Sequence, residues 1–304
     1  MKGRGGGRGR GSVLVTGASS GIGAAIAHLL ARRGVRVFGT IRRPQSTGDL
    51  ERAGVTPVRM DITDQTSIAT ARAAVDAALD GAPLAALVNN AGIPAAGPLE
   101  LLPLDELRHV LEVNLVGVVA VTQAFLPLLK AARGRIVNVS SVAGRVALPF
   151  MGPYAASKFA LEAVSDSLRR ELLPFGVTLI VVEPGSVRSR IWERVQAMDL
   201  TRYAGTQYER VLERVRAHAL RSGERGLPPE VVARAVARAL TVRRPPTRVL
   251  VVESVLTQRI LEWLPARWLD RLIGRAVWHA TVTPPADGSG PAALPRSAPR
   301  SRES

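Results

Sequence analysis

The most informative stretch of the chain is VLVTGASSGIG, residues 13–23, because it joins a short apolar strand directly to a glycine-rich turn. Gly17, Gly21 and Gly23 fall in that turn, and a helical pattern continues to about residue 33. Glycine is needed where a Cβ would block close approach of the backbone to a pyrophosphate. The unpaired N–H groups at the start of the helix would face the same anion. The spacing therefore indicates a nucleotide site, with an ordinary helix entry as the alternative.

Apolar, β-rich runs alternate with longer helical patterns in the rest of the chain. The strands are continuous apolar runs rather than alternating ones, which is typical of a parallel sheet covered by helices on both faces. We therefore expect one α/β domain, a doubly wound Rossmann-like fold with about seven parallel strands, whose ligands bind beyond the carboxyl ends of the strands. The predicted strands are 13–16, 35–40, 55–60, 84–90, 135–140, 177–183 and 248–252, and the predicted helices include 21–33, 64–79, 104–131 and 153–173.

The two ends of the chain differ in composition from this domain. Residues 1–12 are basic and glycine-rich and are expected to form a flexible arm. Residues 283–304 are rich in Pro, Ser and Gly and are expected to be disordered. The domain is predicted over residues 13–255, followed by an amphipathic helical extension over 256–282. The arm leads into a strand without an apolar signal segment, so we expect a cytoplasmic protein.

The composition argues against several kinds of site. The chain has 304 residues, no Cys and four scattered His, so we expect neither thiolate chemistry nor a metal centre. The net charge of +16 alone would suggest nucleic acid or an anionic membrane. However, only three of the 41 basic residues are lysines, a bias that indicates genome-wide composition, and aromatic residues make up only 4%. We therefore expect no specific nucleic-acid partner.

The turn after the second predicted strand carries Arg42 and Arg43 and no acidic residue. In a dinucleotide site an acid here binds the ribose hydroxyls of NAD, whereas an Arg favours the 2′-phosphate of NADP. Arg42 therefore predicts NADP(H), with NAD(H) as the alternative. Asp61, which ends the third strand, could accept a hydrogen bond from the adenine amino group or could begin the cap of the next helix.

Tyr154 and Lys158 lie four residues apart at the start of a predicted helix, so they share one helix face. Lys158 is a lysine in a region whose other basic residues are arginines. An ammonium beside a phenol favours the phenolate and should lower the pKa of Tyr154. Tyr154 would then serve as an acid or base near neutral pH, with two unrelated surface neighbours as the alternative.

Further polar residues follow the strands in a fixed order. Asn89-Asn90-Ala91-Gly92 ends the fourth strand, Asn114 lies in the long helix, Ser140 and Ser141 follow the fifth strand, and Glu183-Pro184-Gly185 closes the sixth. Together with the glycine turn and Tyr-x-x-x-Lys, this set resembles the classical short-chain dehydrogenases/reductases over about residues 12–255. The stretch LPFMGPYAASKFALEAVSDSLRREL, residues 148–172, resembles the branch of retinol and 17β-hydroxysteroid dehydrogenases.

The resemblance implies catalytic roles for Asn114, Ser141, Tyr154 and Lys158. Tyr154 would be the acid or base, and Ser141, 13 residues before it, would bind the substrate oxygen in preference to Ser140. Lys158 would bind the nicotinamide ribose and tune Tyr154. Asn114 would bend its helix and hold a water of a proton relay. The residues implied to bind the cofactor are Gly17, Ser20, Gly21, Ile22, Gly23, Arg42, Asp61, Ile62, Asn89, Tyr154, Lys158, Pro184, Gly185, Val187 and Ser189.

By the same resemblance the chain would be an NADP(H)-dependent oxidoreductase that interconverts an alcohol and a carbonyl on a bulky apolar, steroid- or retinoid-like substrate. The alternative is an NADP(H)-binding sensor without catalysis. Residues 188–226 would form a helical lid, and residues 146–151 could line the substrate pocket or pack as an ordinary loop. The helices at 104–131 and 153–173 would form a homodimer or homotetramer interface. The basic, Trp-containing extension over 256–282 is expected to pack on the domain or on another subunit, with peripheral membrane contact as the alternative.

Overall fold

The computed structural model of the chain describes residues 11–43 and 47–278, and its centre is one parallel sheet. Seven strands pair in the order β3-β2-β1-β4-β5-β6-β7, and every pairing is parallel. The Rossmann-like fold is thus confirmed. The strand order reverses beside β1, which is where such folds bind nucleotides. The strands are β1 (Ser12–Val15), β2 (Val37–Ile41), β3 (Val55–Arg59), β4 (Leu84–Asn89), β5 (Arg135–Val139), β6 (Thr178–Pro184) and β7 (Arg248–Val251).

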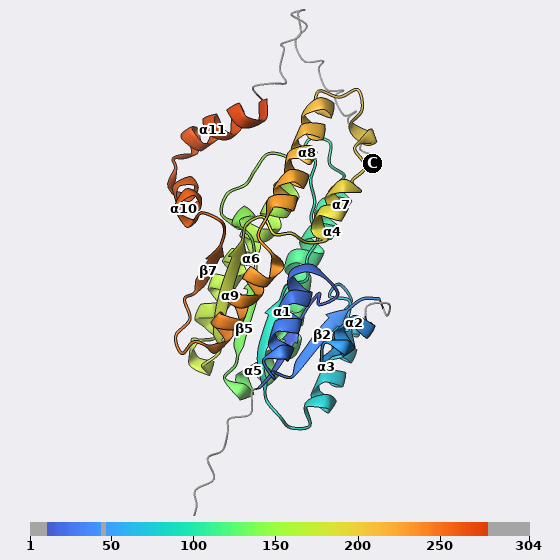
Figure 1. The fold of residues 1–304 in the computed structure, drawn as a ribbon, viewed down its shortest axis with the longest axis vertical. Coiled ribbons are helices and arrows are strands. Elements are labelled where there is room, and N and C mark those ends of the chain that lie inside the picture. Colours follow the sequence, from blue (N-terminus) through green and yellow to red (C-terminus); the bar gives the residue numbers. More distant parts are fainter. Residues whose placement is uncertain (1–10, 44–46, 279–304) are drawn as a thin grey trace, which may run out of the picture.

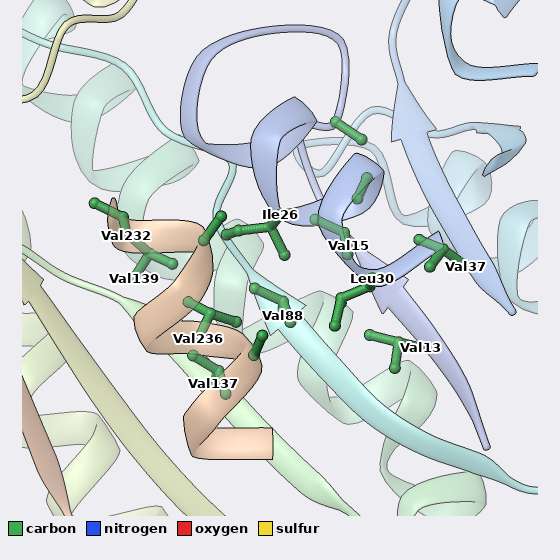
Figure 2. Packing of buried hydrophobic residues seen from close by; sticks show 14 of the residues in the cluster. Val13, Val15, Ile26, Leu30, Val37, Val88, Val137, Val139, Val232 and Val236 are labelled. Carbon is green, nitrogen blue, oxygen red and sulfur yellow. The ribbon is translucent and has the colours of Figure 1, made fainter. Parts of the chain in front are cut away.

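One face of the sheet is covered by α1 (Gly21–Arg32) and α9 (Pro229–Thr241), which lie side by side (Figure 1). Apolar side chains at helical spacing on both helices point at the sheet, as Figure 2 shows for Ile26 and Leu30 of α1 and Val232 and Val236 of α9. The sequence patterns predicted α1 but not α9. The residues that these helices cover include Val13, Val15, Val37, Val88, Val137 and Val139.

The opposite face is covered by α3 (Gln65–Leu79), α5 (Gly117–Ala132) and α6 (Gly152–Glu171), while the short α2 (Thr47–Arg52) lies against β3. Asp64 caps α3, since its carboxylate accepts the N–H groups of Thr66 and Ser67. The segment Leu104–Ala132 is long and apolar enough to cross a membrane. It packs instead on α3 and β4 through fully buried residues such as Val121 and Phe125.

The helix expected over 104–131 is confirmed, but it is not α-helical throughout. α4 (Leu104–Leu111) passes into a π-helical turn, Glu112–Val116, before α5 begins. Asn114 sits inside that turn and is fully buried. Its side chain bonds the backbone of Ile93, an interaction that holds the wider turn in place.

The lid region, residues 188–226, contains α7 (Ile191–Gln196), a 3₁₀ turn at Thr201–Tyr203 and α8 (Glu209–Arg225). After β7 the chain forms two helices, α10 (Val255–Trp263) and α11 (Ala266–Trp278), which lie at the margin of the body (Figure 1). The expected single extension is broken before Pro265, as the residue preceding a proline disfavours helix. Of the expected flexible arm, Ser12 belongs to β1; residues 1–10 and the expected tail, 283–304, lie outside the described residues.

Candidate active site

A cavity of about 560 Å³ lies at the carboxyl ends of β1, β2, β3 and β4, where the strand order reverses. Its walls come from the glycine turn, the ends of β2 and β3, the segment after β4, and α7. Eight predicted cofactor residues line it: Gly17, Ser20, Gly21, Ile22, Arg42, Asp61, Ile62 and Ser189.

The glycine turn is held against the segment after β4 by the side chain of Thr16. Its hydroxyl oxygen accepts the N–H groups of Asn90 at 2.9 Å and Ala91 at 3.0 Å. The Asn90 amide in turn donates to the carbonyl oxygen of Thr16 at 3.0 Å. Gly17 has a φ of +66° and a Cβ there would lie 3.0 Å from Ala91 Cα, so a side chain would be strained and would crowd the turn. This glycine-lined floor leaves the room that a dinucleotide needs.

The far end of the cavity is strongly basic. Arg42 and Arg43, just after β2, face it together with Arg194 from α7. Desolvation, and after it the charges of Arg42 and Arg43, lower the pKa of Arg194, so Arg194 lies within electrostatic range of the other two guanidinium groups. Asp61 accepts hydrogen bonds from the N–H and hydroxyl of Thr63, and these bonds hold the pKa of its carboxyl below the usual value.

Tyr154 and Ser141 meet beyond the end of β5. Ser141 is the N-cap of a 3₁₀ turn, so its hydroxyl accepts the N–H of Ala143 at 3.1 Å. Burial raises the pKa of the Tyr154 phenol, and a hydrogen bond with Ser141 opposes that rise. The direction is opposite to the one expected from Lys158, because desolvation of the phenolate dominates. The neighbouring Ser140 hydroxyl is buried without a hydrogen-bond partner among the described residues, and Tyr154 bonds Ser141 instead.

Lys158 lies under the Tyr154 ring, with Nζ 5.7 Å from the ring centroid. The ammonium donates to the carbonyl oxygen of Val139 at 3.0 Å. Burial lowers the pKa of Lys158 to about 8, an effect that the nearby Glu162 carboxylate opposes. The lysine is therefore poised to change charge close to neutral pH.

Asn114 joins this group through the π-helical turn. Its carbonyl oxygen accepts the N–H of Ile93 at 2.8 Å, and its amide donates to the Ile93 carbonyl oxygen at 2.9 Å and to the Ser157 hydroxyl at 3.0 Å. A Cβ on Gly92 would lie 3.2 Å from Asn114 Oδ1 and 3.9 Å from Lys158 Nζ. The amide oxygen and the ammonium thus flank one backbone position, and the oxygen keeps an acceptor site for a water.

Several predicted cofactor residues lie behind the cavity. The Asn89 amide bonds Thr122 and Asn138 inside the core, each at 2.9 Å, and it is Asn90 that faces the cavity. Gly23 packs on the Gly17 carbonyl, so it shapes the turn rather than the wall. Pro184, Gly185 and Val187 form the backbone between β6 and the lid, where Val187 pairs with Leu227.

Sequence reasoning missed part of the wall. Arg190, Ile191, Glu193 and Arg194 of the lid region line the cavity beside the glycine turn. Their only signal in the sequence was an apolar and basic segment after Ser189, in a chain where arginine is common. Arg43 was visible beside Arg42 but was not assigned to the site. The remaining missed wall residues are Ser19, Thr40, Ile41, Met60, Ile93 and Val113.

A buried carboxylate cluster lies beneath the site. Glu183 is fully buried at the end of β6, and its carboxylate has no hydrogen bond among the described residues. Arg248 lies 3.4 Å from it and binds Glu162 at 3.0 Å and Asp166 at 2.9 Å. Burial and the Glu162 charge raise the pKa of Glu183 to about 7. The cluster therefore holds more acid than its arginine neutralises.

An apolar cluster closes the lid side of the molecule. Phe150, Tyr203, Val211 and Leu212 are buried against one another, and Trp278 of α11 packs with them. The Phe150 ring lies 6.0 Å from that of Tyr208 and 5.8 Å from that of Trp278. Within the loop 146–151 the side chains divide: Phe150 is buried in this cluster, whereas Leu148 is half exposed.

Comparisons with known proteins agree with this site. The short chain dehydrogenase family profile matches residues 12–200. The chain is 33% identical over 268 residues to the NADPH-dependent 3-dehydrocapnine reductase of Ornithobacterium rhinotracheale, covering 85% of this chain and 94% of the relative. It is 36% identical over 296 residues to human retinol dehydrogenase 5, covering 90% and 89% of the two chains. A crystal structure of a short-chain dehydrogenase from Streptomyces avermitilis superimposes with a TM-score of 0.70 at 28% identity, covering 90% and 97%.

The matches to these relatives extend over 85% or more of this chain, and not only over its nucleotide-binding half. Their activities, as named, are oxidations and reductions at alcohol and carbonyl carbons. The protein is therefore a short-chain dehydrogenase/reductase of the retinol dehydrogenase-like branch, an oxidoreductase that uses a nicotinamide nucleotide.

Proposed function

We propose that this protein is an NADP(H)-dependent enzyme that interconverts a bulky apolar alcohol and its carbonyl compound. The observation that carries the proposal is the pairing of a Ser141–Tyr154–Lys158 group, whose lysine is buried, with a cavity whose adenosine end is lined by Arg42 and Arg43. The first feature supplies the acid and base that interconversion of an alcohol and a carbonyl compound requires. The second is a receptor for a phosphate that NADP(H) carries and NAD(H) lacks.

In the reductive direction Tyr154 is the acid. Its raised pKa keeps the phenol protonated at neutral pH, so a proton is available for the substrate oxygen. Ser141 donates a second hydrogen bond to that oxygen and stabilises the developing negative charge. The bound nicotinamide supplies the hydride that reaches the carbonyl carbon. The products are the alcohol and the oxidised nucleotide, and Tyr154 is left as the phenolate.

Lys158 and Asn114 return the proton to Tyr154. The ammonium lies beneath the phenol ring and stabilises the phenolate that the reaction leaves. The free acceptor site of Asn114 holds a water beside Gly92, across from the Lys158 nitrogen. With a pKa of about 8, Lys158 can pass a proton on and be protonated again from this water. In the oxidative direction the same steps run in reverse.

The cofactor preference rests on charge. Arg42 and Arg43 follow β2 at the position where an acid would bind a ribose diol, and no acid is present there. Asp61 is the carboxylate whose pKa responds to Arg42, and its Oδ1 oxygen is already bonded by Thr63. The named activity of the Ornithobacterium relative, NADPH dependence, supports the same choice.

The apolar substrate rests on the cluster around Phe150. The lid contributes Tyr203, Val211 and Leu212 to it, so the lid packs on the loop 146–151 mainly through apolar side chains. An apolar wall binds substrates by burial of hydrocarbon, which favours long or polycyclic compounds over small polar ones. The retinol relative acts on a substrate of this kind by name.

The test is consumption of NADPH and NADH with a panel of retinal-like, steroid and long-chain ketone substrates, and the reverse assay with their alcohols. We expect turnover with NADPH preferred at least tenfold over NADH, and Arg42→Gln should remove most of that preference. Equal use of both nucleotides would contradict the cofactor assignment. Tight NADPH binding without turnover of any apolar or polar carbonyl would favour the sensor.

We further propose that α10 and α11 lie on an anionic membrane surface. Within these two helices no residue is buried, and Leu256, Trp263 and Trp268 are 73%, 84% and 63% exposed. Arg271 stacks on Trp268 at 5.7 Å, and further arginines flank the apolar face, a pattern typical of an interfacial helix. Because α11 ends in the apolar cluster around Phe150, a lipid-dissolved substrate would enter beside it.

Vesicle flotation tests this contact. The protein should float with vesicles of anionic phospholipid, less with zwitterionic ones, and the double variant Trp263→Ser, Trp268→Ser should lose flotation while keeping turnover of a soluble ketone. Flotation that the variant retains, or that neutral vesicles match, would contradict it. We propose a homodimer through the helices at 104–132 and 152–171. Val116, in the π-helical turn before α5, and Phe159 of α6 are 47% and 44% exposed, and the molecular mass in solution tests this interface.

A further inference from the structure

The lid helix α7 carries one arginine, Arg194, to which no ligand or ion-pair partner among the described residues has been assigned. Arg194 faces the nucleotide cavity together with Arg42 and Arg43, although about 150 residues of chain separate it from them. No carboxylate among the described residues forms an ion pair with any of the three guanidinium groups. The Asp61 carboxylate acts on Arg42 alone, so three converging cations are costly to hold together unless a further anion binds between them.

Two contacts of Trp192 anchor α7 next to the cavity. Trp192 donates its indole N–H to the Val187 carbonyl oxygen at 2.7 Å, which ties the helix to the segment after β6. On the other side the Trp192 ring packs on Gly223 of α8, where even a Cβ would lie 2.5 Å from the ring. Arg190, one turn earlier, is already paired with Glu193 at 3.3 Å. Arg194 is therefore the basic residue of α7 that is left for a ligand.

We propose that Arg194 binds the 2′-phosphate of NADP(H) jointly with Arg42 and Arg43, and that this contact draws the lid onto the cofactor. The inference rests on the proposed NADP(H) dependence and extends it to the lid. The 2′-phosphate is favoured over the pyrophosphate because the two arginines that repel Arg194 are those after β2, at the adenosine end. A planar guanidinium can bind two phosphate oxygens at once, which a third cation from another element would reinforce.

One consequence is a lid that distinguishes the two nucleotides. NAD(H) would bind at the glycine turn and leave Arg194 without a phosphate partner. Its binding would therefore not stabilise α7 and α8. NADP(H) would bridge β2 and α7. Since α8 contributes Val211 and Leu212 to the apolar cluster, the phosphate contact would also order the substrate side.

Adenosine 2′,5′-bisphosphate and AMP differ in the 2′-phosphate. Calorimetric titration of the protein with each ligand therefore measures the contribution of this phosphate to affinity. Arg194→Gln should weaken the bisphosphate about tenfold and leave AMP unchanged, the loss expected for one charge-assisted contact. Arg210→Gln is the control, because Arg210 belongs to the lid helix α8 and is not part of the cavity wall, and it should change neither. Equal weakening of both ligands by Arg194→Gln, or no weakening, would overturn the inference.

Hydrogen exchange over residues 191–225 tests the lid. NADPH should slow exchange there in the wild-type protein and not in Arg194→Gln, whereas NADH should do so in neither; equal protection in the variant would overturn the coupling. If Arg42→Gln abolishes the preference for the bisphosphate and Arg194→Gln preserves it, only the role of Arg194 fails. If the wild type shows no preference, NADP(H) dependence fails as well.

Discussion

The side-chain nitrogen of Lys158 donates a hydrogen bond to the backbone carbonyl oxygen of Val139 at 3.0 Å, so the last residue of β5 holds the lysine from the strand end. This bond fixes Nζ beneath the Tyr154 ring but gives the ammonium no full countercharge. The nearest acid that acts on it is Glu162, one turn along α6. The result is a buried cation whose pKa falls to about 8.

The first prediction concerns stability against pH. Lys158 has a pKa of about 8 when folded and an ordinary value of 10.5, so between these values the unfolded chain binds more protons. Stability should therefore rise with pH over this window, by roughly 3 kcal/mol from this residue. Urea unfolding of the wild type and Lys158→Met at pH 8 and pH 10 measures it. The rise should be absent in the variant, and an equal rise in both would show that another group is responsible.

The second prediction separates chemistry from binding. Tyr154→Phe removes one hydroxyl and keeps the ring over Lys158, so turnover should fall by about 10³-fold, the usual contribution of a general acid. The dissociation constant for NADPH should stay within about twofold of the wild-type value, because the glycine turn and the arginines are untouched. Single-turnover kinetics and fluorescence titration measure the two quantities. Near-normal turnover would remove Tyr154 from the mechanism.

The third prediction concerns the buried carboxylates. Glu183 has a raised pKa of about 7, so its folded form holds a proton that the unfolded chain loses near 4.5. Its contribution to stability is present at acid pH and is lost as pH rises through 7. Glu183→Gln should therefore raise the free energy of unfolding at pH 8, by roughly 2 kcal/mol. Glu162→Gln is the control: it removes the 3.0 Å partner of Arg248 and should destabilise the protein. A Glu183→Gln variant that is less stable at pH 8 would contradict the assignment.

The fourth prediction tests the glycine turn. A Cβ on Gly23 would clash with the Gly17 carbonyl oxygen and lie 2.5 Å from the Asn90 amide nitrogen. Gly23→Ala should therefore open the turn, weaken NADPH binding at least tenfold and destabilise the fold by about 2 kcal/mol or more. Gly274→Ala in α11, where a Cβ meets nothing within 4 Å, should be neutral or slightly stabilising. Calorimetric melting of both variants decides the point, and equal melting temperatures would contradict it.

The elements that depend on local pattern were predictable from the sequence. The apolar runs predicted all seven strands to within about two residues at each end, and the glycine turn and Tyr154–Lys158 were found where the structure has them. α9 was missed because most of its buried residues are alanines, which leaves Val232 and Val236 as the larger side chains of its buried face. The helix over 104–131 was drawn as one piece because π-helical turns depend on a long-range contact, here between Asn114 and Ile93.

The site was predictable in its chemistry but not in its surroundings. Spacing along one chain identified Ser141, Tyr154 and Lys158, yet the pKa of Tyr154 depends on burial, and the sequence expectation had the wrong direction. Likewise, Arg194 gave no signal of its own among 41 basic residues. Only the packing of Trp192 between Val187 and Gly223 brings it to the nucleotide cavity.

The π-helical turn at Glu112–Val116 also determines in which direction the side chains of α4 point relative to those of α5. A π-turn holds one residue more than a regular turn, which rotates the preceding side chains by about 100° relative to those of α5. Removing a single residue here would restore a regular helix without shortening the core. It would turn Val110, the buried residue of α4, toward solvent and take the Asn114 side chain away from Ile93. The extra residue of the π-helical turn thus allows one long helical segment to pack in the core and also to place Asn114 in the catalytic group.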